Sequence, residues 1–163
     1  MTDQKRYVLL GPGQGTTLAR SPSGGGVTFK VSGRETGGTA SIFESLRPAG
    51  DLGGPALHRH AFDEAFYILE GEYIIKVADR LMSAGVGSFV YVPGGTIHAF
   101  RHTGRGVGRL LTICHPAGIE EIFAATDSVE RAAMEDRHGA QTMGPPLDAS
   151  SASSLERAEP PAT

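Results

Sequence analysis

The sequence predicts one domain of the all-β class, built as a sandwich or a barrel. Its 163 residues fall within the usual size of a single domain, about 100–200 residues. From Val27 onward, runs of four to eight residues rich in β-branched and aromatic types recur, and Gly, Pro or Asp ends each run. The spacing of these runs, roughly 8–12 residues, is typical of all-β folds and not of alternating βαβ units.

The N-terminal part predicts one short strand followed by a loop. Residues 7–10 form a brief apolar run, and residues 11–26 are rich in Gly, Ser and Pro. The segment GPGQGT at 11–16 has glycines like those of a phosphate-binding loop, but no Lys-Ser or Lys-Thr pair and no amphipathic helix follow it. We therefore interpret it as a turn.

The central part predicts the strands of the barrel. Within each run, apolar residues either alternate with polar residues or follow one another directly, and turn residues bound the run on both sides. The predicted strands cover residues 27–31, 39–46, 56–60, 65–69, 72–77, 81–82, 88–92, 98–102 and 109–115. The tight Glu70-Gly71 connection between two apolar runs predicts a hairpin.

The C-terminal part changes in character after Pro116. Ile119, Ile122 and Phe123 have helical spacing, and Asp127 followed by Glu130 resembles a capping box that opens a second helix ending near Gly139. The remainder is rich in Pro, Ser and Ala, so we expect it to be disordered. The predicted organisation is an N-terminal strand and loop (1–26), a barrel (27–116), a helical segment (117–139) and a disordered tail (140–163).

Composition excludes several classes of protein. No apolar run approaches the roughly 18 residues of a membrane span, and the N-terminal run is too short for a signal peptide, so we expect a soluble, cytoplasmic protein. The net charge of −3, with no basic run, makes nucleic acid an unexpected partner. Cys114 is the only cysteine, which excludes an internal disulfide and a thiolate metal cluster. We expect Cys114 to be a buried small hydrophobe.

Four side chains form a candidate metal site. His58 and His60 are two apart on a predicted strand, so their imidazoles share a face about 7 Å apart along the strand. Glu64 follows across a turn and offers a hard carboxylate oxygen. His98 comes from a separate segment, after a Pro-Gly-Gly turn that redirects the next strand.

The spacing of these residues resembles the two motifs of the cupin superfamily. GGPALHRHAFDEAFYILEG matches the first motif at His58, His60, Glu64 and Gly71, and GSFVYVPGGTIHAF matches the second at Gly87, Pro93, Gly95 and His98. The resemblance covers about residues 39–115 and implies a jelly-roll barrel of six to eight strands that holds one divalent metal ion through His58, His60, Glu64 and His98. Two alternatives stay open: a cupin that works without metal, and a three-histidine site with Glu64 beside it.

The chain departs from the family pattern at two places. The first motif's leading glycine is displaced, since four residues instead of five separate Gly53 from His58. The second motif usually ends in Asn, where this chain has His102. On a strand, His98, Phe100 and His102 share a face. His102 is therefore a candidate catalytic base, or else a hydrogen-bonded core residue.

The implied ligand set predicts an open, reactive site. Three imidazoles and one carboxylate leave two positions on a six-coordinate ion, and they suit Fe, Ni, Co, Mn, Cu or Zn. With Glu64 facing inward, Phe66, Ile68 and Phe100 face inward too, so we expect them to form an apolar substrate pocket or plain barrel core. No other cofactor is expected.

Within the first motif, the segment Glu-x-Phe-Tyr-Ile-Leu-Glu-Gly is similar to that of single-domain cupins of the quercetin 2,3-dioxygenase type. That resemblance implies a dioxygenase acting on a small aromatic or enolic molecule, with Glu64 as both metal ligand and base. A Zn-dependent polyketide cyclase or isomerase, with His102 or Glu64 moving protons, and a non-catalytic ligand-binding cupin are the alternatives. The family also implies a homodimer, for which the outward residues Tyr67 and Leu69 offer an apolar contact.

Overall fold

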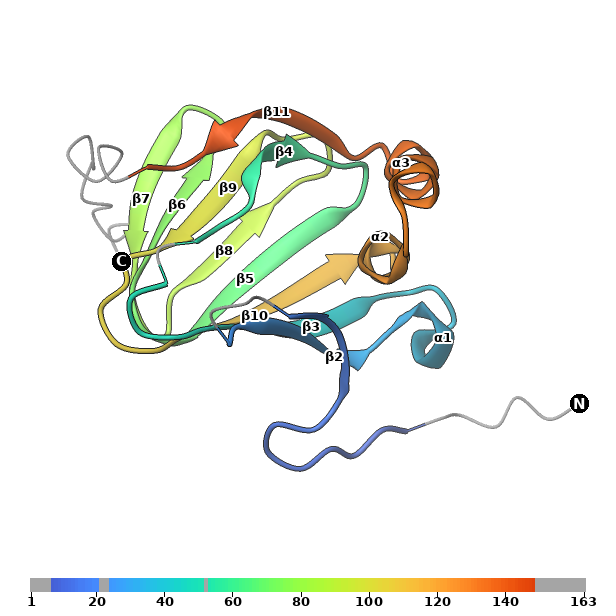
Figure 1. Cartoon of the computed structure of the whole chain (residues 1–163), viewed down its shortest axis with the longest axis horizontal. Coiled ribbons are helices and arrows are strands. Elements are labelled where there is room, and N and C mark those ends of the chain that lie inside the picture. Colours follow the sequence, from blue (N-terminus) through green and yellow to red (C-terminus); the bar gives the residue numbers. More distant parts are fainter. Residues whose placement is uncertain (1–6, 21–23, 52, 149–163) are drawn as a thin grey trace, which may run out of the picture.

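A computed structural model describes residues 7–20, 24–51 and 53–148 of the chain. These residues form eleven strands in two antiparallel sheets that face each other (Figure 1). The first sheet has the order β1-β2-β3-β10-β5-β8, with bounds Thr16–Arg20, Gly26–Val31, Ser41–Arg47, Gly108–His115, Asp63–Glu70 and Phe89–Val92. The second has the order β11-β4-β9-β6-β7, with bounds Gln141–Pro146, Ala56–Arg59, His98–His102, Tyr73–Val77 and Arg80–Ala84. The prediction of an all-β sandwich or barrel is confirmed.

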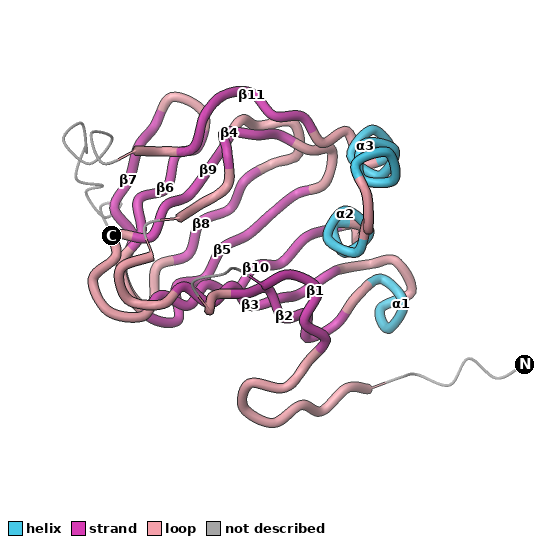
Figure 2. The backbone as a smooth tube through the Cα atoms, viewed as in Figure 1, coloured by secondary structure: helices cyan, strands magenta, loops and turns pink. Residues whose placement is uncertain are grey.

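Three helices lie on one side of the two sheets (Figure 2). They are α1 (Gly33–Thr36), α2 (Ile119–Ala124) and α3 (Ser128–Arg137). The two C-terminal helices match the prediction, and the Asp127 carboxylate accepts hydrogen bonds from the backbone N–H groups of Val129 and Glu130 at the start of α3. The sequence analysis missed α1, although Ser32 and Glu35 form the reciprocal capping box that opens it.

The main core lies between the two sheets. Strand β10 alternates strictly between buried and less buried residues, as expected for a strand with one face on the core. The fully or nearly fully buried members of this core are Phe66, Ile68, Tyr73, Ile75, Ala84, Val92, Phe100 and Leu110. A second cluster of Phe29, Phe43, Phe62 and Cys114 packs against Ile119 and Phe123 and so attaches α2 to the first sheet.

The prediction for the N-terminal strand was wrong about its position in the sequence. Residues 7–10 are not a strand, and the strand lies instead within the predicted loop, as β1 paired antiparallel with β2. The alternating TTLAR segment finds a partner strand there, whereas residues 7–10 have no such partner, and an extended segment becomes a strand only by pairing. The GPGQGT turn is confirmed by a hydrogen bond of 3.1 Å from the Gln14 N–H to the Gly11 carbonyl.

The predicted hairpin at Glu70-Gly71 was also wrong. Strand β5 belongs to the first sheet and β6 to the second, so this tight turn carries the chain from one sheet to the other. Gly71 adopts φ 82°, and a Cβ there would lie 2.7 Å from the Val107 carbonyl oxygen. The hairpin is formed one strand later, where β6 pairs with β7.

The prediction of a disordered tail from residue 140 was wrong for its first residues. Gln141–Pro146 forms β11, which pairs with β4. A strand that ends in two prolines is compatible with its place at the edge of the sheet, where proline is tolerated. The rest of the predicted tail, residues 149–163, lies outside the described residues.

Candidate metal centre

The four predicted ligands converge from both sheets. His58 lies on β4 directly opposite His98, the first residue of β9, while His60 follows β4 and Glu64 lies on β5. One ligand atom from each of the four side chains lies within 4.8 Å of the other three. His60, Glu64 and His98 are buried, and His58 is partly exposed. The sequence prediction of one shared site for these residues is therefore supported by their placement.

Backbone carbonyls orient the three imidazoles. The Nδ1 atoms of His58, His60 and His98 lie 2.7, 2.8 and 2.8 Å from the carbonyl oxygens of Ala56, Phe62 and Thr96. A carbonyl only accepts hydrogen bonds, so each Nδ1 carries the proton. In a neutral imidazole, each Nε2 then presents a lone pair, which is the form that binds a metal ion.

The donor set fits a divalent cation. Oε2 of Glu64 lies 2.9 Å from Nε2 of His60 and 2.9 Å from Nε2 of His98. An ionised carboxylate and neutral Nε2 atoms all offer electron pairs, so they repel one another unless protons or a cation lie among them. A divalent ion bound by nitrogen and oxygen ligands satisfies all four groups at once.

The electrostatics favour an ionised Glu64 and a neutral His58. Burial alone would raise the pKa of Glu64, but protons on Nε2 of His60 and His98, which a bound cation would replace, hydrogen-bond to the carboxylate and hold that pKa well below its usual value. Burial, and then the neighbouring His98 ring, lower the pKa of His58. At neutral pH, Glu64 is thus ionised and His58 is neutral.

Two glycines fix the turn that delivers His98. The backbone N–H of Gly94 donates to the Asp63 carboxylate at 2.8 Å, and the N–H of Gly95 donates to the His60 carbonyl at 2.7 Å. A Cβ at Gly94 would lie 2.3 Å from the Ala61 carbonyl oxygen, so this close approach requires glycine. The Pro-Gly-Gly segment therefore ties the second half of the site to the first.

Cys114 lies next to the site without the properties of a ligand. It is fully buried on β10, opposite Glu64, and its thiol donates to Oε1 of Glu64 at 3.9 Å. Burial and the adjacent carboxylate raise the pKa of this thiol well above its usual value. The expectation that Cys114 is a buried small hydrophobe is confirmed.

A pocket of about 300 Å³ lies over the metal ligands. His58 and His60 form part of it, and Phe62, Ile119, Ile122 and Phe123 supply its apolar wall. Its polar rim contains Arg131 and Glu135 of α3 together with Gln141 and Thr142 of β11. The sequence analysis assigned none of these wall and rim residues to the site, because apolar helical spacing shows that a helix packs against something but not that it covers a metal.

The predicted pocket residues Phe66, Ile68 and Phe100 lie inside the barrel core. Their exposed fractions are 1%, 0% and 9%, and none of them lines the pocket over His58 and His60. Phe66 does lie near the site, with its ring centroid 6.2 Å from that of His98. A substrate contact with these side chains stays a prediction.

His102 lies at the opposite end of β9 from the metal ligands. It shares the inward face with His98, as predicted, but four residues of strand separate the two by about 13 Å, with Phe100 between them. Its Nδ1 lies 2.8 Å from the Asp51 carbonyl oxygen, and its ring centroid lies 5.3 Å from that of Tyr73. This placement is that of a buried core residue and gives no direct path to the metal centre, so a catalytic role for His102 stays a prediction.

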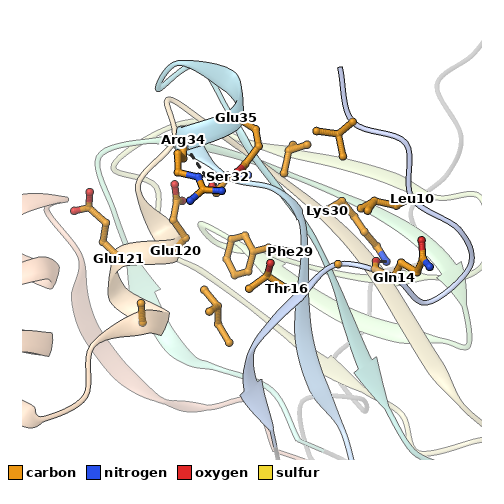
Figure 3. Close-up of a pocket in the computed structure, with 15 residues that line it drawn as sticks. Leu10, Gln14, Thr16, Phe29, Lys30, Ser32, Arg34, Glu35, Glu120 and Glu121 are labelled. Carbon is orange, nitrogen blue, oxygen red and sulfur yellow. Dashed lines mark hydrogen bonds and ion pairs between the residues drawn. The ribbon is translucent and has the colours of Figure 1, made fainter. Parts of the chain in front are cut away.

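A larger cavity of about 870 Å³, shown in Figure 3, also adjoins α2 but is lined by other residues of that helix than the metal pocket. It opens between the N-terminal segment, β2 and α2, with Leu10, Lys30 and Glu120 among its lining residues. None of the four metal ligands contributes to it. The metal pocket is therefore the smaller of the two cavities but the one that adjoins reactive groups.

The comparisons with known proteins agree with this fold and site. Residues 43–114 match the family model of the cupin domain. These residues include all four candidate ligands. The match and the two facing sheets together support the cupin superfamily for this part of the chain.

Similar proteins span a range of functions. An uncharacterised protein of Streptomyces coelicolor is 35% identical over 57 residues, which cover 35% of this chain and about half (53%) of that protein. The polyketide cyclase RemF from Streptomyces resistomycificus superposes with a TM-score of 0.55 at 18% identity, covering 68% of this chain and 80% of RemF. Oxalate decarboxylase from Bacillus subtilis, described with Mn(II) centres, gives a TM-score of 0.53 at 22% identity, covering 62% of this chain and 28% of that one. At these identities the structures share the fold alone.

Among the helices of the described residues, none has the length and apolar character that crossing a membrane requires.

Proposed function

We propose that this protein is a metal-dependent enzyme that acts on a small aromatic or enolic molecule, as a dioxygenase of the quercetin 2,3-dioxygenase type. The observation that carries the proposal is the convergence of three imidazoles and one carboxylate beside an apolar pocket that His58 and His60 line. Four protein ligands leave open positions on a six-coordinate ion, which is the arrangement of reactive and not of structural sites.

The side chains around the site have separate tasks in this proposal. His58, His60 and His98 would hold the ion, which would supply Lewis-acid chemistry toward a substrate oxygen atom. Glu64 is ionised at neutral pH and lies beside His60, so in this proposal its carboxylate is the group that would accept the proton of an enol or phenol bound at the site. Glu64 is buried, and burial strengthens its electrostatic contacts with the neighbouring ligands.

The pocket wall selects a small and largely apolar substrate. Phe62 stacks on the His60 ring at a centroid distance of 3.8 Å and offers an aromatic surface beside a metal ligand. Ile119, Ile122 and Phe123 supply the rest of the apolar wall. At the rim, the Arg131 guanidinium lies 2.9 Å from Glu135 and is half exposed, so it can contact a polar substituent that projects from the pocket. A planar molecule with one oxygen-bearing edge toward the metal fits this arrangement.

The first experiment measures metal content and oxygen uptake on the same preparations. Elemental analysis of the wild type should give about one equivalent of metal, and the His58→Ala, His60→Ala double variant should give none. An oxygen electrode then follows uptake by the metal-loaded protein with quercetin or another flavonol. Glu70→Gln is the matched control, because Glu70 lies on β5 with Glu64 but is exposed at the other end of the strand. The proposal requires uptake by the wild type and control, and none by the double variant.

Two alternative functions predict different results in this experiment. A Zn-dependent polyketide cyclase or isomerase would contain zinc and convert substrate without taking up oxygen. A ligand-binding cupin would be stabilised by a small molecule without converting it. Absence of metal from the wild type, even after reconstitution, would contradict both enzymatic functions.

A further inference from the structure

The helices α2 and α3 lie side by side at one end of the sheets (Figure 1). Ile119, Ile122 and Phe123 of α2 belong to the wall of the metal pocket. The short link 125–127 joins the end of α2 to the start of α3, so the two helices form a hairpin. The open ends of this hairpin, at the start of α2 and the end of α3, need a contact of their own.

His138 makes the contact between these open ends. It is the residue that caps the end of α3, and its ring lies against Gly118, the residue that caps the start of α2. A Cβ at Gly118 would overlap the His138 ring, so this close approach requires glycine. Nε2 of His138 lies 3.0 Å from Oε2 of Glu121, one turn further along α2. A carboxylate accepts hydrogen bonds, so Nε2 carries the proton and donates to Glu121.

The same histidine contacts the turn that follows the metal ligand His60. The backbone N–H of Ala61 donates to the His138 carbonyl at 2.9 Å. The His138 ring lies edge-on to the ring of Phe62, with centroids 6.4 Å apart, and Phe62 stacks on the His60 ring at 3.8 Å. His138 does not line the metal pocket, but it contacts two parts of its wall, α2 and Phe62.

Arg137 strengthens the attachment of α2 to α3. Its guanidinium lies 3.0 Å from the same oxygen of Glu121 that His138 contacts. The hydrogen bond with His138, and then the one with Arg137, outweigh burial and lower the pKa of Glu121. The neighbouring Glu120 makes a separate attachment, because its carboxylate accepts from the N–H of Gly33 at 2.6 Å, at the start of α1. Only the attachment through Glu121 joins α2 to α3 and the turn after His60.

We propose that His138 is a positioning residue of the metal pocket, which holds α2 and Phe62 in place over the metal ligands. The inference rests on the proposed function, since it takes this pocket as the place where the substrate binds. Displacing a group that positions a substrate by about 1 Å can cost about 100-fold in rate, so the wall needs a fixed position. Without the His138 ring, α2 keeps its attachment through Glu120 but loses the one to α3 and Phe62.

Amide hydrogen exchange of the metal-free, full-length chain tests the proposal without relying on a reaction. His138→Ala should speed exchange in peptides that cover residues 119–124 and 60–62 by about tenfold, the effect of losing one hydrogen bond to a charged group. Glu121→Gln removes the charged acceptor and should speed exchange in the same peptides. Asp136→Asn is the matched control, because Asp136 is exposed on α3 two residues from His138, and it should exchange like wild type. Exchange in β10 should keep its wild-type rate in every variant.

A second measurement follows metal removal from the Ni²⁺-loaded protein by excess EDTA. Removal should be about tenfold faster from His138→Ala than from wild type. The Kd for Ni²⁺ should stay unchanged, because a loosened wall speeds entry and exit of the ion equally. His138→Gln keeps a hydrogen-bond donor for Glu121 but lacks the ring, so its removal rate should lie between the two.

The role of His138 is overturned by wild-type exchange in residues 119–124 of His138→Ala, by metal removal at the wild-type rate, or by equal acceleration in Asp136→Asn. Acceleration that extends to β10 also overturns it, since this would show a general loss of stability. If His138→Ala does not fold, His138→Gln and Glu121→Gln decide by the same criteria. A wild type that binds no Ni²⁺ would refute the proposed function, and the exchange rates would still decide whether His138 holds α2.

Discussion

Replacing Glu64 by Gln tests whether the four converging side chains bind a metal as one unit. The change keeps the size of the side chain and its buried position but removes the negative charge between His60 and His98. Loss of a group that only supports a metal ligand typically weakens binding by 10–100-fold. Because Glu64 is itself a candidate ligand, we expect a loss of about 100-fold for Ni²⁺.

The loss of affinity converts into a difference in thermal stability. At a free Ni²⁺ concentration of 100 times its wild-type Kd, binding stabilises the folded wild type by about 2.7 kcal/mol. The same Ni²⁺ concentration equals the Kd of a variant that binds 100-fold more weakly, so its stabilisation is only about 0.4 kcal/mol. For a chain of this size, about 2–4 °C of Tm per kcal/mol gives shifts of about 5–11 °C for wild type and about 1–2 °C for the variant.

Differential scanning calorimetry with and without Ni²⁺ measures both shifts, each against the metal-free Tm of the same protein. Glu70→Gln serves again as the control, because it removes an equal charge from the exposed end of β5. We expect the control to shift like wild type. An equal Ni²⁺ shift in Glu64→Gln and wild type would refute the assignment of Glu64 as a ligand, and no shift in wild type would refute the metal site itself.

Three further predictions concern the fold. Hydrogen bonds from Ser32 lower the pKa of Glu35 from 4.5 to about 2, so its contribution is present above pH 4.5 and is lost as the pH falls toward 2. Glu35→Gln should therefore lower the free energy of unfolding by about 0.5–1 kcal/mol at pH 7, with the difference from wild type disappearing near pH 2 in urea titrations. Ile68→Ala, at a fully buried position, should cost about 2–5 kcal/mol in the same assay, whereas Val86→Ala, at a position that is 70% exposed, should cost less than about 0.5 kcal/mol. Gly71→Ala should cost more than about 1 kcal/mol, because it combines a positive φ with a contact of 2.7 Å to a carbonyl; a cost within error of zero would show that the turn adjusts freely.

The fold class, most strand positions and the four candidate ligands could be predicted from the sequence. Period-two patterns depend only on nearest neighbours along the chain, and the His-x-His spacing on a strand fixes which face both imidazoles share. The capping residue of α3 could be predicted for the same reason, since the Asp127 carboxylate accepts hydrogen bonds from N–H groups only two and three residues away. Interactions that are local in sequence could therefore be predicted.

The pairing of the strands and the residues that cover the metal ligands could not be predicted from local sequence patterns. The local sequence around Gly71 is typical of a hairpin. The two strands that flank it nevertheless belong to different sheets, because each pairs with strands that are distant in the sequence. The same holds for Gln141–Pro146, which is a strand only because β4 offers it an edge. His102 shares a face with His98, yet the length of β9 places it about 13 Å away and Phe100 separates it from the site. Pairing, distance along a strand and the packing of α2 over the pocket all arise from long-range contacts, and a one-dimensional pattern does not contain them.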